Sequence, residues 1–403
     1  MFYLDTGNKD MCCGCGACES ICPTKCITMV ADEEGFLYPK KQDDLCTDCG
    51  LCESVCPSIH KEKIDYKESG NLPKAFMAIN KDEAIVHNSA SGGVFSAVAN
   101  AYCKDNFVIF GAQFDDQLRV IHSHVHSLDE IDKYRKSKYV QSDINDSYKK
   151  AEEYLKSGKR VLFTGTPCQI AGLRLYLKKE YEHLFCVDLV CHGVPNQKIF
   201  DKYIQYLENK YKGKVTDFTF RHKIINKQDK WNSRNVKIRI SERELIMNAN
   251  EDKYLRGFHP GLYYRPSCYK CKYANPKRIS DLTMADFWGV EKLFPEKDVH
   301  KGISALIVNS VKGNKLLSDL NQIMELNEVD FDYVIQSNAQ LNRPAKINPK
   351  REQFFDLLNE NRFDLAVDRC IPRPSIIRRI ASKVLPTSTK DFIKKLVFKE
   401  EGE

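Results

Sequence analysis

The sequence predicts a multidomain protein with α+β and α/β parts, in which a small cysteine-rich module precedes an α/β core and a helical C-terminal region. Ten of the 17 cysteines in the 403 residues lie before residue 57. After a charged stretch, short apolar strands alternate with helical segments, which is typical of a layered α/β domain. The predicted boundaries are 1–60 for the module, 61–74 for a linker, 75–310 for the core and 311–403 for the helical region.

Eight N-terminal cysteines form two copies of the pattern Cys-x₂-Cys-x₂-Cys-x₃-Cys-Pro. In two-cluster ferredoxins, three thiolates of one run and the fourth thiolate of the other run hold each [4Fe–4S] cluster. Two zinc sites would also use paired cysteines. A zinc interpretation, however, does not explain the third evenly spaced cysteine of each run or the Cys-Pro sequence that ends it. Cys13 and Cys26 fall outside the pattern, so we expect them to pack as apolar thiols. The predicted ligands are Cys12, Cys15, Cys18 and Cys56 for one cluster and Cys46, Cys49, Cys52 and Cys22 for the other.

The composition indicates a reducing, cytoplasmic location. The N-terminus lacks the basic and apolar segments of a signal peptide, and no apolar run reaches the roughly 18 residues of a membrane span. The net charge of +7 is spread out, without the basic and aromatic stripe of a nucleic-acid-binding surface. Residues 376–380 and 392–397 place basic and apolar side chains at helical spacing. We expect a solvated helix there, with weak contact to an anionic membrane surface as the alternative.

The core alternates strands and helices along the chain. Apolar runs and turn signals predict strands near 75–79, 107–112, 160–163 and 184–190 and helices near 94–99, 146–157 and 169–181. Alternating apolar and polar residues over 218–246 predict antiparallel strands. This order favours a sheet with partly parallel strands, and ligands of such sheets collect at the carboxyl ends of the strands.

Four later cysteines predict a third metal site. Cys268 and Cys271 form a two-ligand clip without a local partner, and Cys168 and Cys191 each follow a predicted strand at the same edge of the sheet. A third [4Fe–4S] cluster is our leading interpretation. The alternatives are a zinc site from the same residues, a redox-active dithiol at the clip and a nucleophilic Cys168 at a helix N-terminus. The remaining thiols are expected to be buried: Cys103, Cys186 and Cys370.

Two glycine-containing turns suit a phosphate-bearing cofactor, although the sequence has no GxGxxG after a strand and no P-loop. Each turn places backbone N–H groups or hydroxyls at the start of a helix, and each one alone is also explained as a plain helix cap. Lys136 and Lys138 can add positive charge against a pyrophosphate. Because iron–sulfur clusters move single electrons and most metabolites change by two, a flavin is the expected partner of the clusters. The turns consist of Ser91, Gly92 and Gly93, and of Thr164, Gly165, Thr166 and Pro167.

Seven motifs, taken in order, resemble the beta-subunit family of coenzyme F-420 hydrogenase/dehydrogenase. They include the segments GTPCQIAGL, DLVCHGVP and RPSCYKCKYA. Their shared order makes the resemblance specific, and a ferredoxin module fused in front is also an arrangement of this family. The motifs occupy residues 89–95, 137–142, 163–173, 188–195, 220–221, 265–274 and 281–289, within the range 75–310.

The resemblance implies a non-covalent FAD beside a [4Fe–4S] cluster and hydride exchange with a substrate or a deazaflavin coenzyme. It implies that Asp286 lies near the flavin or the cluster, and His192 and Tyr139 are the candidates for protonating the substrate. The residues expected at FAD are Ser91, Gly92, Gly93, Ser137, Lys138, Tyr139, Thr164, Gly165, Thr166, Pro167, Gln169 and Asp286.

We therefore expect an FAD- and iron–sulfur-dependent oxidoreductase in which electrons pass between the ferredoxin-type clusters, the third cluster and FAD, in either direction. Its expected partners are an electron donor or acceptor protein and an organic redox substrate, of which coenzyme F-420 is one candidate. The first alternative is a non-catalytic electron-relay subunit of a larger redox complex. The second is a redox accessory enzyme of a surface-polysaccharide pathway.

Overall fold

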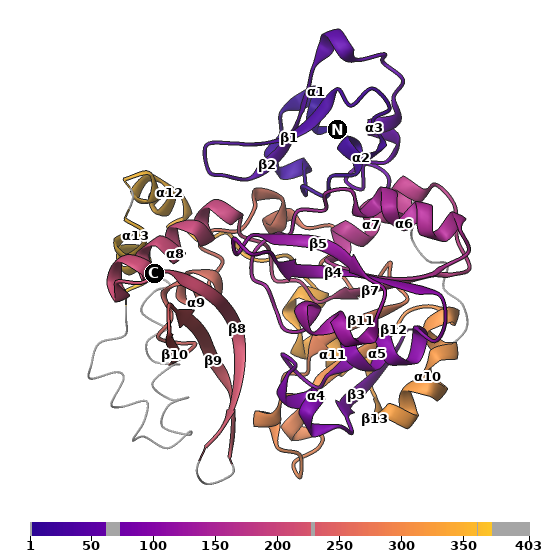
Figure 1. The fold of residues 1–403 in the computed structure, drawn as a ribbon, viewed down its shortest axis with the longest axis vertical. Helices are drawn as coiled ribbons and strands as arrows, with labels where there is room; N and C mark the ends of the chain where they lie inside the picture. Colours follow the sequence, from indigo (N-terminus) through magenta and orange to yellow (C-terminus); the bar gives the residue numbers. More distant parts are fainter. Residues whose placement is uncertain (1, 62–72, 227–229, 361, 373–403) are drawn as a thin grey trace, which may run out of the picture.

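The computed structural model describes residues 2–61, 73–226, 230–360 and 362–372. In Figure 1 the N-terminal module forms a lobe at the top, above a large sheet with helices, and a three-stranded sheet stands beside the large one. This arrangement confirms the predicted multidomain class. Most of the predicted linker and all of the basic C-terminal tail lie outside the described residues.

The sequence repeat of the N-terminal module is also a structural repeat. In each copy the third cysteine lies in a short helix, either α2 (Ala17–Ile21) or α3 (Leu51–Ser54). Gly16 and Gly50 precede these helices with φ angles of 72° and 68°. A side chain disfavours this left-handed backbone, so the two glycines let each loop turn sharply into its helix.

Eight strands form one mixed sheet in the order β13-β3-β12-β11-β7-β6-β4-β5. The neighbours β4, β6, β7 and β11 run parallel, and the other pairs are antiparallel. The prediction of partly parallel strands is therefore confirmed. The bounds are β3 Lys74–Asn80, β4 Phe107–Phe114, β5 Val120–Val125, β6 Arg160–Gly165, β7 Leu184–Leu189, β11 Leu282–Asp286, β12 Ser304–Val308 and β13 Met324–Val329.

Helices cover both faces of this sheet (Figure 1). In β6, Leu162 packs with α5 and α10 on one face, whereas Val161 and Phe163 pack with α6 and α7 on the other. Because both faces are covered, β6 reads as a continuous apolar run rather than an alternating one. The helices of this domain are α4 Glu83–His87, α5 Val94–Tyr102, α6 Ser147–Lys156, α7 Pro167–Leu177, α10 Val311–Ile323 and α11 Phe331–Ser337.

A second hydrophobic core lies between the three-stranded sheet and four helices. Aromatic side chains such as Phe200, Phe220 and Tyr254 fill it, and each large ring buries much apolar area. The antiparallel strands predicted over 218–246 are confirmed. The elements are β8 Val215–Ile225, β9 Trp231–Ile240, β10 Arg243–Asn248, α8 Gln197–Tyr211, α9 Lys253–Phe258, α12 Arg351–Asn359 and α13 Phe363–Cys370.

The N-terminal module docks on both cores. Its hairpin, β1 (Ile27–Ala31) and β2 (Leu37–Lys41), contributes Tyr38 to the aromatic core. Its first cysteine loop packs on α7, where a Cβ at Gly172 would lie 3.1 Å from the Cys15 Sγ. A side chain at this position would force Cys15 or the Tyr148 hydroxyl, 2.8 Å from that Cβ, to shift.

The sheet continues past the predicted boundary at residue 310. β13 lies in the region predicted to be helical, and it pairs with β3 at the edge of the sheet. Its half-exposed, mixed sequence gives little strand signal. The helix predicted over 169–181 begins at Pro167 and ends at Leu177. Among the helices of the described residues, none combines the length and the apolar character that a membrane crossing requires.

Candidate metal and cofactor site

The structure brings the eight ferredoxin-type cysteines together as two sets of four. The second site is the more open one, because Cys49 is exposed, whereas Cys15 of the first site is buried. Each set combines three cysteines of one run with the fourth of the other run, which is the exchange expected of a two-cluster module. Cys12, Cys15, Cys18 and Cys56 line one cavity, and Cys46, Cys49, Cys52 and Cys22 line another.

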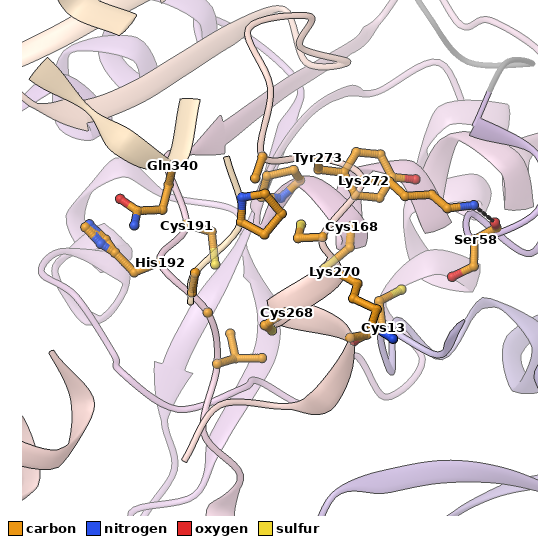
Figure 2. Close-up of a pocket in the computed structure, with 18 of the residues that line it drawn as sticks. Cys13, Ser58, Cys168, Cys191, His192, Cys268, Lys270, Lys272, Tyr273 and Gln340 are labelled. Carbon is orange, nitrogen blue, oxygen red and sulfur yellow. Dashed lines mark hydrogen bonds between the residues drawn. The ribbon is translucent and has the colours of Figure 1, made fainter. Parts of the chain in front are cut away.

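Four cysteines of the core line a further cavity of about 290 Å³ (Figure 2). Cys168 follows β6 and Cys191 follows β7, so the two parallel strands deliver them to one edge of the sheet. Cys268 and Cys271 lie on the loop of the short helix η5 (Pro266–Lys270). Three separate segments of the chain thus bring four thiols to one cavity, and we call these four side chains the ring of thiols.

Burial makes these thiols reluctant to ionise. Burial, and next the Cys168 thiol, raise the pKa of Cys191 from 9.0 to about 12. The pKa of Cys268 lies well above its usual range, because of burial and then of Cys191 and Cys271. A hydrogen bond with Cys13, followed by burial, has the same effect on the pKa of Cys168. A nucleophilic Cys168 would need a lowered pKa, whereas several thiolates can gather around a metal because its positive charge balances them.

Cys13 is a fifth thiol at this cavity, which sequence reasoning missed. It lines both the core cavity and the first ferredoxin-type cavity, and Figure 2 shows it beside Lys270. The Cys12-Cys13 doublet was its only sequence signal. Cys26 is buried, as expected of a packing thiol, but its Sγ lies 3.4 Å from the Cys22 Sγ in the second cavity. The buried states predicted for three other thiols are confirmed, at Cys103, Cys186 and Cys370.

A buried ion pair supports the ring. Arg278 contacts Asp188 of β7 at 2.9 Å, with 2% and 0% of their side chains exposed. The Thr283 hydroxyl donates to Asp188 at 2.6 Å, and Arg278 donates to the Tyr273 carbonyl at 2.8 Å. These contacts fix the end of β7, which leads to Cys191, against the segment that follows the Cys268–Cys271 clip.

A basic cavity of about 330 Å³ lies where the 132–138 segment faces β8. Four cations and a hydroxyl line it, from Lys133, Arg135, Lys136, Ser137 and Lys138, together with the carboxylates of Asp132 and Asp217. Arg135 pairs with Asp132 at 2.8 Å, so the net positive charge comes from the lysines. The Lys138 ammonium donates to the carbonyls of Lys133 and Arg135 at 2.7 and 2.8 Å. Burial, and then Lys136, lower the pKa of Lys138 from 10.5 to about 7. The cavity offers positive charge and a hydroxyl, the groups that bind a phosphate.

The first predicted turn is tightly packed. The Gly92 N–H donates to the Ser304 hydroxyl at 2.9 Å, and the Ser91 hydroxyl donates to the Ile303 carbonyl at 2.9 Å. A Cβ on Gly92 would lie 2.2 Å from the Ala78 carbonyl oxygen. Gly93, with a φ of 84°, begins α5. The close approach of this turn to β3 and β12 is enough to require the glycines.

The second predicted turn caps α7. The Gln169 side chain accepts from the Thr166 N–H at 3.0 Å and donates to the Ser142 carbonyl at 3.2 Å. The Thr164 hydroxyl donates to the Phe110 carbonyl at 2.9 Å. Thr164 and Gln169 therefore serve the fold, whereas the Thr166 hydroxyl lies 3.2 Å from the Cys168 Sγ. Gly165 and Pro167 shape the strand-to-helix turn between them.

Tyr139, His192 and Asp286 converge on Arg221 of β8. Arg221 contacts Asp286 at 2.5 Å, and its charge lies close enough to Tyr139 and His192 to influence the pKa of both side chains. Burial raises the pKa of Tyr139 and lowers that of His192. His192 also lines the thiol cavity, so this polar cluster adjoins the ring. Sequence reasoning gave Arg221 no role, although residues 220–221 are one of the seven motifs.

Comparison with protein families agrees with these observations. Residues 11–59 match the model described as "4Fe-4S dicluster domain", so the N-terminal module is an iron–sulfur domain. Residues 158–332 match the model for the C-terminal part of the beta subunit of coenzyme F420 hydrogenase/dehydrogenase. Residues 158–332 are therefore similar to the C-terminal part of the beta subunits of that family, and the iron–sulfur domain lies in front of them.

Comparison with individual proteins finds similarity to solved structures. No curated protein matches the chain. A chain of the F420-reducing [NiFe] hydrogenase complex from Methanosarcina barkeri is 16% identical, with a TM-score of 0.43 over 73% of this chain and 91% of that chain.

Proposed function

We propose that the chain is an FAD- and iron–sulfur-dependent oxidoreductase of a reducing, cytoplasmic compartment. Its protein partner donates or accepts single electrons, and its substrate is a deazaflavin coenzyme or another organic molecule. FAD, when bound, supplies the exchange between single electrons and a hydride, and the clusters supply single-electron transfer.

The convergence of Cys168, Cys191, Cys268 and Cys271 on one cavity carries this proposal. A single zinc ion needs its sulfurs about 2.3 Å from the metal, whereas a cubane spreads its thiolates over four iron atoms. The ring of thiols therefore suits a [4Fe–4S] cluster better than zinc.

The position of the ring supports a route for electrons. Cys13 lines both the thiol cavity and the first ferredoxin-type cavity, so a third cluster would sit next to the iron–sulfur domain. On its other side lie His192 and the cluster of Tyr139, Arg221 and Asp286. The core site thus lies between the electron-carrying module and the polar groups expected to handle the substrate.

The side chains of the core have distinct tasks in this proposal. The basic cavity at Lys136, Ser137 and Lys138 binds the phosphates of FAD. Tyr139 keeps its hydroxyl proton at neutral pH because burial raises its pKa, so it can donate a proton to the substrate. His192 stays neutral because burial lowers its pKa, so it can accept a proton from the substrate during the reverse reaction.

An electron-transfer assay tests the proposal. The chain is reconstituted anaerobically with iron, sulfide and FAD and reduced by dithionite, and oxidised deazaflavin coenzyme is then added. We expect stoichiometric flavin, reduced through the clusters, and its reoxidation by the deazaflavin or by another member of a panel of organic acceptors. A protein that takes up iron but no flavin would instead be an electron relay.

The proposed FAD site predicts a pH-dependent affinity. Lys138 is charged below its pKa of about 7 and neutral above it, so its attraction for a phosphate is lost as the pH rises. We expect FAD affinity to fall by up to about tenfold per pH unit above 7. Lys138→Met should bind FAD more weakly and lose this dependence, as measured by fluorescence titration between pH 6 and 9.

Lys133→Met is the matched control, because Lys133 lines the same cavity but is more exposed. It should weaken binding and keep the pH dependence. An unchanged pH profile in Lys138→Met would contradict the assignment of the basic cavity to the phosphates.

A further inference from the structure

Arg265 is a fully buried cation between the iron–sulfur domain and the core. It has 0% exposure and lies three residues before Cys268. Its backbone N–H donates to the Val194 carbonyl at 2.9 Å, in the segment that follows Cys191. Its side chain extends in the opposite direction, into the N-terminal module, where it bonds to Cys12. Arg265 thus contacts residues beside both the core thiol cavity and the first ferredoxin-type cavity.

The guanidinium is surrounded by neutral acceptors and one thiol. It donates to the carbonyls of Cys12 and Leu37 at 2.7 Å each, and to the Gln141 side chain at 3.2 Å. It lies over the Tyr38 ring, 4.3 Å from the centroid. Its fourth acceptor is the Cys12 Sγ at 3.5 Å.

No carboxylate of the described residues forms an ion pair with Arg265. An isolated buried charge is costly, and proteins pair such charges or place them beside bound ions. A [4Fe–4S] cluster with four thiolate ligands is anionic, and it becomes more negative when it is reduced. The site lined by Cys12, Cys15, Cys18 and Cys56 can thus supply the counter-charge that the protein chain does not.

We propose that Arg265 is the counter-charge of the first cluster and raises its reduction potential through the hydrogen bond to the Cys12 sulfur. This inference rests on the proposed function, because it takes Cys12 as a ligand of that cluster. The step is the gain of one electron by the oxidised cluster from an external reductant, without uptake of a proton. A fixed cation beside the cluster stabilises the more negative product, and hydrogen bonds to the sulfurs raise cluster potentials.

The second cluster site has a different electrostatic environment. Lys41 is the cation that lines its cavity, and this side chain pairs with Asp43 at 3.1 Å and with Asp48 at 3.9 Å. Asp5 and Glu53 also line this cavity. The positive charge of Lys41 is therefore already balanced by carboxylates. A change at Arg265 should shift the reduction potential of the first cluster and leave that of the second cluster unchanged.

Redox titration followed by EPR tests the proposal on the anaerobically reconstituted full chain, with dithionite as reductant. In Arg265→Gln we expect one of the two dicluster potentials to fall by at least 59 mV, the equivalent of a tenfold change in a one-electron equilibrium. The other potential should stay unchanged. Arg265→Lys keeps the charge but loses the planar donor set, so it should show a smaller fall.

Arg351→Gln is the matched control at the same domain boundary. Arg351 also docks the N-terminal hairpin, through two contacts with Glu34 at 2.7 and 2.5 Å, and it packs over the Phe355 ring. The partner of Arg351 is the Glu34 carboxylate and not a cysteine sulfur. Both dicluster potentials should therefore be unchanged in Arg351→Gln.

Three results of the redox titrations would each overturn the role of Arg265, and a fourth result concerns cluster content. The three are unchanged potentials in Arg265→Gln, equal shifts of both clusters, and the same shift in Arg351→Gln. Arg265→Gln could instead lose one cluster while Arg265→Lys shows unshifted potentials. That result would also overturn the electrostatic role of Arg265 and would show that this residue only stabilises the structure around the cluster. Wild-type protein that takes up no cluster would instead contradict the proposed function itself.

Discussion

Replacing Cys268 by Ser should remove about one third of the iron, from about twelve to about eight atoms per chain, because each cubane holds four. Cys268 belongs to the ring of thiols around the core cavity and lines neither of the two ferredoxin-type cavities. The EPR signals of the two dicluster centres should therefore remain. Iron and acid-labile sulfide are measured on anaerobically reconstituted protein.

Cys103→Ser is the control for this experiment. Cys103 is a buried thiol at the end of α5 that packs in the apolar core on the other face of the sheet. Its replacement should leave the iron content unchanged, although it adds a polar hydroxyl to an apolar site. Equal iron in the wild type and in Cys268→Ser would remove the basis for a third cluster.

Replacing Arg278 by Met should lower the free energy of unfolding by about 3–5 kcal/mol, because it leaves the Asp188 carboxylate buried without its cation. Asp188 and Arg278 are almost fully buried, so water cannot replace the lost partner. The same change frees the segment behind the clip, because the hydrogen bond to the Tyr273 carbonyl is lost. Urea unfolding of the two proteins gives the difference.

Arg119→Met is the comparison for a surface ion pair. Arg119 contacts Asp115 at 2.7 Å, but 60% of its side chain is exposed. Such pairs contribute at most about 1 kcal/mol. If Arg278→Met and Arg119→Met unfold at the same urea concentration as the wild type, the buried pair does not stabilise the strand that leads to Cys191.

The sequence predicted best those features whose residues are close in the chain. The two ferredoxin-type runs carry most of their ligands within one loop, so spacing alone identified them. Cys168 and Cys191 could be joined to the Cys268–Cys271 clip because each follows a parallel strand, and adjacent parallel strands end at one edge of the sheet. This step needed a correct prediction of β6 and β7.

Contacts between distant segments could not be predicted. Arg265 reaches Cys12 across 253 positions, and no local pattern encodes that contact. Cys13 looked like a packing thiol, because its second cavity forms only when the iron–sulfur domain docks on the core. Likewise, β13 shows little apolar pattern at its sheet edge, and pairing with β3 makes it a strand.

The seven-motif resemblance identified residues that secondary-structure propensity alone would have left without a role. It did not distinguish residues that could contact a cofactor from residues that stabilise the fold around it. Thr164 and Gln169 bond to the protein's own backbone, whereas Ser137 and Lys138 line a cavity. A hydroxyl at a helix start has the same sequence signature in both roles. Only the partners seen in the structure distinguish them.

The most direct test is the amount of iron, acid-labile sulfide and released flavin per chain in anaerobically purified protein. The proposed oxidoreductase predicts about twelve irons, about twelve sulfides and about one FAD, since three cubanes and one two-electron cofactor are required. About eight irons without flavin would contradict it and leave an electron relay with two ferredoxin-type clusters.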